Sequence, residues 1–585
     1  MSKKGQTHSF PVRRALVLAV LMLAFGGLLW RAVDLHVLDR DFLQGQGDAR
    51  SLRVVAIPAH RGMVTDRHGE PLAISTPVET VWANPQELVE APDRWSELAR
   101  ALELSPQRLA RRIRGRADKE FMYLRRQLPP ERARRILELG VPGVSLRREY
   151  KRYYPTSEVA AHVVGFTNVD DRGQEGVELM YDDWLRGTPG SKRVVKDRLG
   201  RIVENVERLA EPKPGRDLRL SLDRRVQFLA YRELKAAIQR HQARSGSAVV
   251  LDARTGEVLA MVNQPAYNPN NRADFSSARY RNRAVTDVFE PGSTIKPFTV
   301  AAALESGEFR PGTPVDTAPG WYTLHGHTIQ DVHNYGQLDV ARVIKKSSNV
   351  GASRIALALD SDRLWQTLSG AGFGLDTGSG FPGEAGGHLS HFRGWGDVEK
   401  ATLAFGYGVS VTPLQLAQAY TAVAGDGRVL PIRFLAAEGE RPEPQSRPFS
   451  ARTAREVRRM MEAVVGPGGT APRAKVPGYR IAGKTGTVHK SKAGGYAEDR
   501  YTAVFVGLAP ASRPRLVMAV VVDEPSAGDY YGGQVAAPVF SRVVGGALRL
   551  LNVPPDDLPE AKTRLALSHP DPSGGAPGAV VEARP

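Results

Sequence analysis

Residues 289–304 read FEPGSTIKPFTVAAAL, and both the fold and the chemistry of this chain are interpreted from this stretch outward. A Pro-Gly turn before a continuous apolar run predicts a buried helix that begins here and ends at Gly307. Ser293 would lie in the first turn of that helix, with Lys296 one turn later on the same face. The positive end of the helix dipole would favour a developing alkoxide at Ser293.

Ser293 and Lys296 form the first candidate catalytic pair. Serine is a weak nucleophile unless a neighbouring base takes its proton. A free lysine has a pKa of about 10.4, so Lys296 acts as a base near neutral pH only if burial or a second cation lowers that pKa. We therefore expect a neutral Lys296 and a second cation close to it.

Two later motifs supply the remaining catalytic groups. They read Ser347-Ser348-Asn349 and Lys484-Thr485-Gly486-Thr487. In this hypothesis Lys484 is the second cation and the Ser347 hydroxyl relays a proton. Asn349 would hold Lys296 and an amide of the substrate by hydrogen bonds.

The third motif is predicted to lie on a strand over residues 479–488, and its last three residues are assigned to substrate binding. Thr485 and Thr487, on either side of Gly486, would bind a substrate carboxylate. The backbone of Thr487 would complete an oxyanion hole with that of Ser293. No metal ion or cofactor is expected in this arrangement.

Each motif alone is weak evidence for a catalytic site. A Ser-x-x-Lys match arises about once by chance in a chain of this length, and the turn Arg254-Thr255-Gly256 imitates the third motif. The structural alternatives are that Ser347 caps a helix and that Lys484 is a solvated strand residue. The set is more specific than its members, because the motifs fall in order on a helix start, an inter-helix loop and a strand.

The C-terminal half predicts a mostly antiparallel sheet packed by helices. A helical pattern over 226–238 leads into a hairpin pattern at 248–252 and 258–262. Two buried strands are expected at 501–508 and 516–522, with a Pro-containing turn between them. Helices lie between the hairpin and these strands, so the fold class is α+β.

The N-terminus carries a membrane signal. Residues 15–30 have no polar side chain beyond an indole, and they follow four basic residues, Lys3, Lys4, Arg13 and Arg14. This pattern predicts an uncleaved anchor over 15–33 with the N-terminus in the cytoplasm. A cleaved signal peptide is the competing interpretation, and it is less favoured because its only small-x-small site, at 24–26, lies inside the apolar run.

Composition divides the rest of the chain at the Pro-rich stretch 211–215, which can continue neither a helix nor a central strand. The N-terminal part mixes short extended runs with basic helices and contains no paired catalytic groups. The predicted segments are a cytoplasmic basic tail at 1–14, the anchor at 15–33, an N-terminal domain at 34–215, the catalytic domain at 216–550 and a flexible tail at 551–585.

The net charge and the cysteine content exclude several kinds of partner and site. The net charge of +17 fits a basic exterior or an anionic membrane surface, and no nucleic-acid module accompanies it, so no nucleic-acid partner is expected. The 585 residues include no cysteine, which excludes disulfides, thiolate metal sites and a cysteine nucleophile.

The three motifs together resemble the signature of serine penicillin-binding proteins and β-lactamases. Longer stretches resemble the class B, division-specific D,D-transpeptidases of the FtsI type. These stretches are 289–297, 347–351, 405–417 and 483–487 in the C-terminal half, and 60–62, 66–67 and 173–178 in the N-terminal half. The resemblance covers nearly the whole chain from the anchor to about residue 550.

The resemblance implies a penicillin-binding transpeptidase fold, a noncatalytic pedestal of mixed α/β structure over 34–215, and a substrate. Ser293 would attack the penultimate D-alanine carbonyl of a peptidoglycan stem peptide, release the terminal D-alanine and pass the acyl group to an amine of a neighbouring stem. β-Lactams would acylate the same serine. The implied location is the bacterial inner membrane at the division septum, with a periplasmic catalytic domain. The implied partners are a membrane-embedded glycan polymerase and other division proteins.

Three alternatives stay open. The first is a D,D-carboxypeptidase or β-lactamase of the same fold, although the second motif here is Ser-Ser-Asn where β-lactamases have Ser-Asp-Asn. The second is an elongation-type transpeptidase. The third is a noncatalytic β-lactam sensor or divisome scaffold, which has no reason to keep all the catalytic residues. A Ser-His-Asp triad through Asp331 and His333 is not favoured, because two residues so close in sequence are unlikely to form that geometry.

Overall fold

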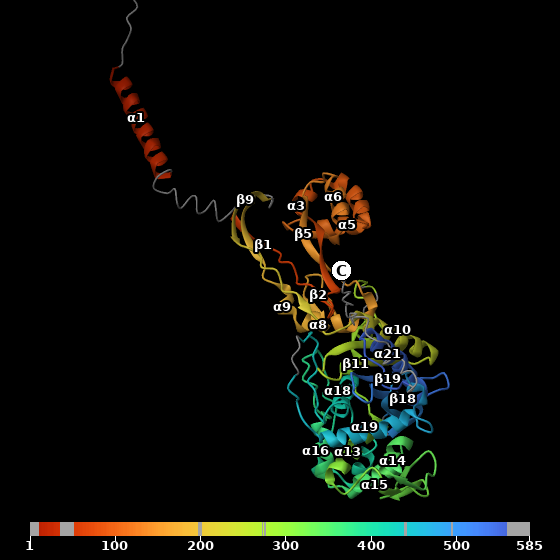
Figure 1. The fold of residues 1–585 in the computed structure, drawn as a ribbon. Coiled ribbons are helices and arrows are strands. Elements are labelled where there is room, and N and C mark those ends of the chain that lie inside the picture. The colour runs from red at the N-terminus through yellow and green to blue at the C-terminus, as the bar shows by residue number, and fades with distance from the viewer. Residues whose placement is uncertain are drawn as a thin grey trace, which may run out of the picture. The chain divides into compact units, whose positions relative to one another are not determined.

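The computed structural model describes residues 11–35, 52–196, 202–271, 273, 276–437, 442–492 and 495–558 (Figure 1). The chain forms two compact units. Unit 1 consists of Met1–His60, Thr76–Lys151 and Gly187–Gly215. Unit 2 consists of Arg61–Ser75, Arg152–Arg186 and Arg216–Pro585. The predicted boundary at 215 is the last residue of unit 1, whereas two segments of the predicted pedestal, 61–75 and 152–186, belong to unit 2.

The N-terminal helix α1 (Pro11–Val33) covers the predicted anchor and has no buried residue. Its 23 residues span about 35 Å at 1.5 Å per residue, which is enough to cross the hydrocarbon core of a bilayer. The helix is therefore a candidate membrane span.

Unit 1 contains two small sheets. In the first, antiparallel sheet, β8 (Gly190–Lys196) is the central strand and lies between β1 (Leu52–Ile57) and β9 (Ile202–Ala210). The later part of β3 (Pro71–Ala83) pairs with β4 (Met122–Leu128), and β5 (Val144–Tyr153) also pairs with β3. The helices of this unit are α3 (Pro85–Leu88), η2 (Pro92–Arg94), α4 (Trp95–Ala101), α5 (Pro106–Arg114) and α6 (Pro130–Leu137).

Apolar residues at helical spacing explain why these helices pack in unit 1. Leu109 and Ile113 of α5 are fully buried, and so are Val81 of β3 and Met122 of β4 in the same core. The arginines of α5 lie mostly on the exposed side, as expected for an amphipathic helix.

Unit 2 is built on a five-stranded antiparallel sheet with the order β12-β11-β19-β18-β17. These strands are β11 (Ser245–Asp252), β12 (Val258–Gln264), β17 (Ala482–Lys492), β18 (Gly495–Ala509) and β19 (Leu516–Asp523). The predicted hairpin and the two predicted late strands are confirmed, and the hairpin strands pair through Val249 and Met261. The continuous apolar runs are explained by burial on both faces.

Helices cover both faces of this sheet. A side chain at Gly507 would meet Phe540 of α21 (Ala537–Leu550), and α10 (Arg224–Arg240) packs against α21 and β12. On the other face, a side chain at Gly486 would meet Pro291 and Thr294, next to the candidate nucleophile. The turn that carries Ser293 therefore lies on the face opposite α21.

The remaining elements of unit 2 are short or surround the site. The longer helices are α13 (Lys296–Ser306), α14 (Val340–Lys346), α15 (Asn349–Ala358), α16 (Ser361–Gly370), α17 (Asp397–Leu403), α18 (Pro413–Ala424) and α19 (Ala451–Val465). The short helices are η3 (Ser157–Val159), α7 (Ala161–Val164), α8 (Gly176–Met180), α9 (Asp182–Arg186), α11 (Ser277–Tyr280), α12 (Arg283–Thr286), η5 (Gly292–Ile295), η6 (Phe392–Gly394), η7 (Pro472–Ala474) and α20 (Gly532–Val535). The short strands are β2 (Val64–Thr65), β6 (Phe166–Thr167), β7 (Gly173–Glu175), β10 (Leu218–Arg219), β13 (Pro314–Asp316), β14 (Trp321–Leu324), β15 (His327–Gln330) and β16 (Gln337–Asp339).

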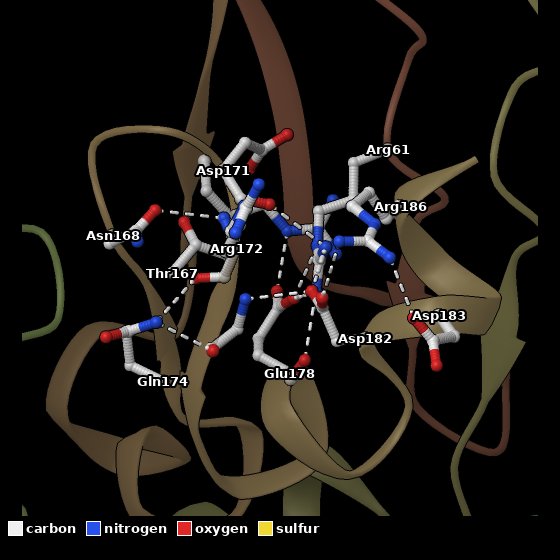
Figure 2. Close-up of polar contacts among 12 residues, drawn as sticks. Arg61, Thr167, Asn168, Asp171, Arg172, Gln174, Glu178, Asp182, Asp183 and Arg186 are labelled. Atoms are coloured by element: carbon white, nitrogen blue, oxygen red, sulfur yellow. Dashed lines mark hydrogen bonds and ion pairs between the residues drawn. The ribbon is translucent and has the colours of Figure 1, made fainter. Parts of the chain in front are cut away.

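A fully buried ion-pair network ties together the N-terminal segments of unit 2 (Figure 2). Arg61 donates from Nε to a Glu178 carboxylate oxygen at 2.7 Å and from Nη1 to Asp182 at 2.7 Å. Arg152 binds the other Glu178 oxygen at 2.6 Å. The motifs 60–62 and 173–178, far apart in sequence, thus meet through Arg61 and Glu178.

Two of the element boundaries that differ from the sequence prediction have a local cause. Ser293 lies in the 3-10 turn η5 rather than in the α-helix, which begins at Lys296. The reason is Pro297, which has no amide to donate to the Ser293 carbonyl, so the Lys296 amide bonds that carbonyl instead. Strand β17 begins at Ala482 rather than 479, because Tyr479 closes a turn onto Val476.

The predicted flexible tail lies largely outside the described residues, which end at 558. Residues 551–558 pack on unit 2, where the Tyr479 hydroxyl donates to the Val553 carbonyl at 2.6 Å. Asp556 accepts hydrogen bonds from the Arg480 amide and from Ser512.

Candidate active site

The three motifs come together at one edge of the sheet of unit 2. The turn η5 packs against β17, and the loop between α14 and α15 brings the second motif to the same place. The five predicted catalytic residues lie on these elements or, for Lys296, at the start of α13, and they are Ser293, Lys296, Ser347, Asn349 and Lys484.

Two glycines allow the turn that carries Ser293 to lie close to its neighbours. Gly292 has φ +52°, and a side chain there would approach Val488 of β17 to 2.4 Å. A side chain at Gly406 would approach the Gly292 backbone to 2.1 Å. The stretches 289–297 and 405–417 therefore contact each other directly, and any larger residue at either position would displace Ser293.

Lys296 is completely buried and points toward the second motif. Its Nζ donates to the Ser347 carbonyl at 2.5 Å and to the Asn349 side-chain oxygen at 2.8 Å, and it lies 3.3 Å from the Ser347 hydroxyl. Within the described residues no hydrogen bond joins Lys296 to the half-buried Ser293 hydroxyl. Burial, and then the neighbouring charge of Lys484, hold the pKa of Lys296 well below its ordinary range, while Asp331 opposes them.

Lys484 is also completely buried and reaches the same hydroxyl from the strand side. Its Nζ donates to Ser347 Oγ at 2.8 Å and to the Thr485 carbonyl at 3.1 Å. Burial lowers the pKa of Lys484 to about 7. Two buried amines thus converge on one neutral hydroxyl, and charging both would bring like charges together in a poorly solvated place.

The second motif is held in an unusual backbone conformation. Ser347 has φ +59°, the left-handed region, where it ends α14. Ser348 caps α15 through the Gly351 amide, and its hydroxyl donates to Asp331 at 2.5 Å. Asp331 also accepts from the amides of Asn349 and Val350, so this carboxylate fixes the loop. The contacts of Asp331 are therefore structural.

The three predicted substrate-binding residues follow Lys484 on β17. Gly486 leaves room for the Pro291 carbonyl, which a side chain would approach to 2.9 Å. The Thr487 hydroxyl accepts from the Gly532 amide at 3.0 Å. The Thr485 hydroxyl is hydrogen-bonded to the Thr470 hydroxyl at 2.8 Å, a partner that the sequence interpretation missed. No short motif surrounds Thr470, so only pairing across the fold identifies it.

Comparison with known proteins agrees with this geometry. The sequence-family model of the penicillin-binding protein transpeptidase domain matches residues 246–545. The family model of the penicillin-binding protein dimerisation domain matches residues 56–220. The chain belongs to the class B penicillin-binding proteins. This family assignment places the three motifs inside the transpeptidase domain and the Arg61 motif inside the dimerisation domain.

Relatives of this penicillin-binding protein match along nearly the whole chain. The peptidoglycan D,D-transpeptidase FtsI of Escherichia coli K12 is 45% identical over 96% of each chain. The probable peptidoglycan D,D-transpeptidase PbpC of Pseudomonas aeruginosa is 44% identical over 96% of this chain and 98% of its own. The crystal structure of penicillin-binding protein 3 of Mycobacterium tuberculosis, complexed with aztreonam, is 30% identical with a TM-score of 0.66 and covers 86% of this chain and 98% of that one.

Within the described ranges, no group of three or more His, Cys, Asp or Glu side chains is placed to hold a metal ion. The chemical resources of the site are therefore a serine hydroxyl, two buried amines, a relay hydroxyl and an amide side chain. Such a set suits acyl transfer through a covalent serine ester.

Proposed function

We propose that this chain is a septal peptidoglycan D,D-transpeptidase that cross-links stem peptides through an acyl-enzyme on Ser293. The observation that carries the proposal is that Lys296 and Lys484 both reach the Ser347 hydroxyl. Lys296 itself lies one helical turn after Ser293. A structural lysine would be solvated or paired with a carboxylate. Here both are buried and hydrogen-bonded to neutral groups, as a proton-transfer site requires.

In the acylation step, Ser293 Oγ bonds to the penultimate D-alanine carbonyl carbon of the donor stem and gives its proton to the neutral amine of Lys296. The negative charge that develops on the carbonyl oxygen is stabilised by the backbone amides of Ser293 and Thr487. When the intermediate collapses, the bond to the terminal D-alanine breaks. The leaving nitrogen takes a proton through the Ser347 hydroxyl, which the protonated lysine resupplies.

In the transfer step, the amine of a neighbouring stem attacks the ester carbonyl and loses a proton to the same base. The new amide bond forms the cross-link, and the C–O bond to Ser293 breaks to regenerate the hydroxyl. Asn349 is proposed to hold the donor amide, and Thr485, Gly486 and Thr487 to bind the terminal carboxylate. The Thr485 hydroxyl would exchange its bond with Thr470 for this one.

The membrane placement is part of the proposal. Helix α1 would anchor the chain in the inner membrane with its N-terminus in the cytoplasm, and the region 34–215 would be a noncatalytic pedestal. The family resemblance further implies that the chain works at the septum and that β-lactams inhibit it. The partners that the resemblance implies are a membrane-embedded glycan polymerase and other division proteins.

The test is covalent labelling of the full-length chain in detergent with a fluorescent penicillin, comparing wild type with Ser293→Ala. We expect persistent labelling that the substitution abolishes. Rapid loss of the label would indicate a β-lactamase instead. A folded wild type that takes no label would contradict the proposal and leave the scaffold hypothesis.

A further inference from the structure

The loop over residues 466–470, between α19 and η7, contacts both the second and the third motif. The Lys346 ammonium donates to the Gly468 carbonyl at 3.0 Å. At the end of the loop, the Thr470 hydroxyl is hydrogen-bonded to the Thr485 hydroxyl at 2.8 Å. Because Lys346 directly precedes the second motif and Thr485 belongs to the third, the loop bridges the two motifs.

The backbone of this loop is packed from two sides. The Ala471 amide donates to the Val464 carbonyl at 2.9 Å. A side chain at Gly469 would approach the same carbonyl to 2.2 Å, so the loop folds closely onto the end of α19. From α20, a side chain at Gly533 would approach the Thr470 carbonyl to 2.2 Å. The Thr470 hydroxyl is therefore presented to β17 from a fixed place.

The hydrogen bond between the two threonines can run in either direction in the free protein, because each hydroxyl can donate or accept. A carboxylate can only accept, and a hydroxyl has one proton to give. Once Thr485 donates its proton to a substrate carboxylate, its bond with Thr470 persists only if Thr470 is the donor. Thr470 is free to do so, because among the described residues its hydroxyl has no other hydrogen-bond partner.

Donation from Thr470 favours carboxylate binding in two ways. It occupies a lone pair of Thr485 Oγ1, so the Thr485 proton points away from Thr470 and toward the ligand. It also polarises the Thr485 hydroxyl, since hydrogen bonds in a chain strengthen one another. Thr485 is only 7% exposed, and the chain therefore acts where water competes little.

We propose that Thr470 is a positioning residue that makes the site specific for donors with a free terminal carboxylate. Its hydroxyl donates to Thr485 Oγ1, and Thr485 donates to the carboxylate of the terminal D-alanine. The inference rests on the proposed function, in which Thr485 binds that carboxylate. Thr470 acts through Thr485 and not by contact with the substrate.

The test uses two thioester donors that differ only in the carboxylate. Both are thioesters of benzoyl-D-alanine, one with mercaptoacetate as the leaving group and one with its uncharged methyl ester. Full-length protein in detergent is compared with Thr470→Val, which keeps the shape of the side chain without the hydroxyl.

We expect Thr470→Val to lower kcat/KM for the mercaptoacetate thioester about tenfold, mainly through KM, because a hydrogen bond to a charged group is lost in strength. The value for the methyl ester should change by less than about twofold. Thr470→Ala removes the same hydroxyl from a smaller side chain and should give the same result.

Two further variants separate this role from a general effect on the fold. Thr470→Ser restores the hydroxyl and should recover most of the preference for the free carboxylate. Thr367→Val is the matched control, because this buried threonine of α16 donates to the Arg363 carbonyl at 3.1 Å. It loses a hydrogen bond that involves none of the three motifs, so the preference should stay as in the wild type.

The two proposals fail in different ways. Equal losses for both thioesters in Thr470→Val would show a merely structural role, and no loss for either would show that Thr485 needs no donor. Each of these results overturns this inference alone. A wild type that uses both thioesters equally well would also overturn the assignment of Thr485 to the carboxylate. A wild type that neither turns over the thioesters nor takes penicillin would contradict the proposed function itself.

Discussion

Two regions of unit 2 bury cations completely, and they do so in opposite ways. Arg61 is surrounded by the carboxylates of Glu178, Asp182 and Asp171, which outweigh the effect of burial and raise its pKa. Lys296 and Lys484 are hydrogen-bonded to neutral oxygens, and burial lowers the pKa of both. A buried cation with carboxylate partners is costly to unpair and so holds its segments together, whereas a buried amine without them is available for proton transfer.

The largest expected effect is on the reactivity of the lysine site. Lys296→Ala is expected to slow acylation of Ser293 by about 10³-fold to 10⁴-fold, because it removes the base. The melting temperature should stay the same or rise, since an uncompensated buried amine is lost. Stopped-flow acylation with a reporter β-lactam measures the rate, and calorimetry measures stability.

Lys296→Arg is the matched control for that variant. An arginine cannot be deprotonated in a protein, so it introduces a permanent charge and supplies no base, and acylation should remain slow. Wild-type acylation in either variant would show that Lys296 is not the base.

Removing a charged partner beside Arg61 should instead lower the stability of the fold. Glu178→Gln leaves Arg61 and Arg152 without their shared carboxylate, so the free energy of unfolding should fall by about 3–5 kcal/mol. Urea unfolding measures this loss. Glu97→Gln, in an exposed ion pair with Arg94, is the control and should cost less than about 1 kcal/mol. Equal losses would show that burial does not distinguish the two pairs.

A smaller effect concerns pH and stability. The pKa of Lys484 is about 7 in the folded chain and near 10.5 when unfolded, so between these values the unfolded state binds more protons. Stability should therefore rise as the pH increases from about 7 toward 10. In Lys484→Met this rise should be smaller, although Lys296 still contributes in the same direction.

Melting temperatures across this pH range test the difference between wild type and Lys484→Met. Identical slopes in the two proteins would mean that Lys484 is charged in the fold, and the contrast with Arg61 would be lost.

Local patterns in the sequence were enough to predict much of this architecture. Alternating and continuous apolar runs predict β11, β12, β18 and β19, because periodicity reports burial directly. The order of the three motifs predicts that Ser293, Ser347 and Lys484 lie together. The 3-10 turn at Ser293 follows from the missing amide of Pro297.

What depends on contacts between distant segments could not be predicted. The pairing of Thr470 with Thr485, and of Arg61 with Glu178, leaves no local signature. The assignment of 61–75 and 152–186 to unit 2 depends on such contacts too.

The central claim is that Lys296 is uncharged in the resting protein, and its titration tests this most directly. Lysine side chains labelled with ¹³C at Cε are followed by NMR from pH 6 to pH 11, with Lys296→Ala and Lys484→Ala to assign the two buried signals. The account predicts that the Lys296 signal titrates far below the other lysines. A Lys296 signal that titrates near 10.4, as a free lysine does, would contradict it.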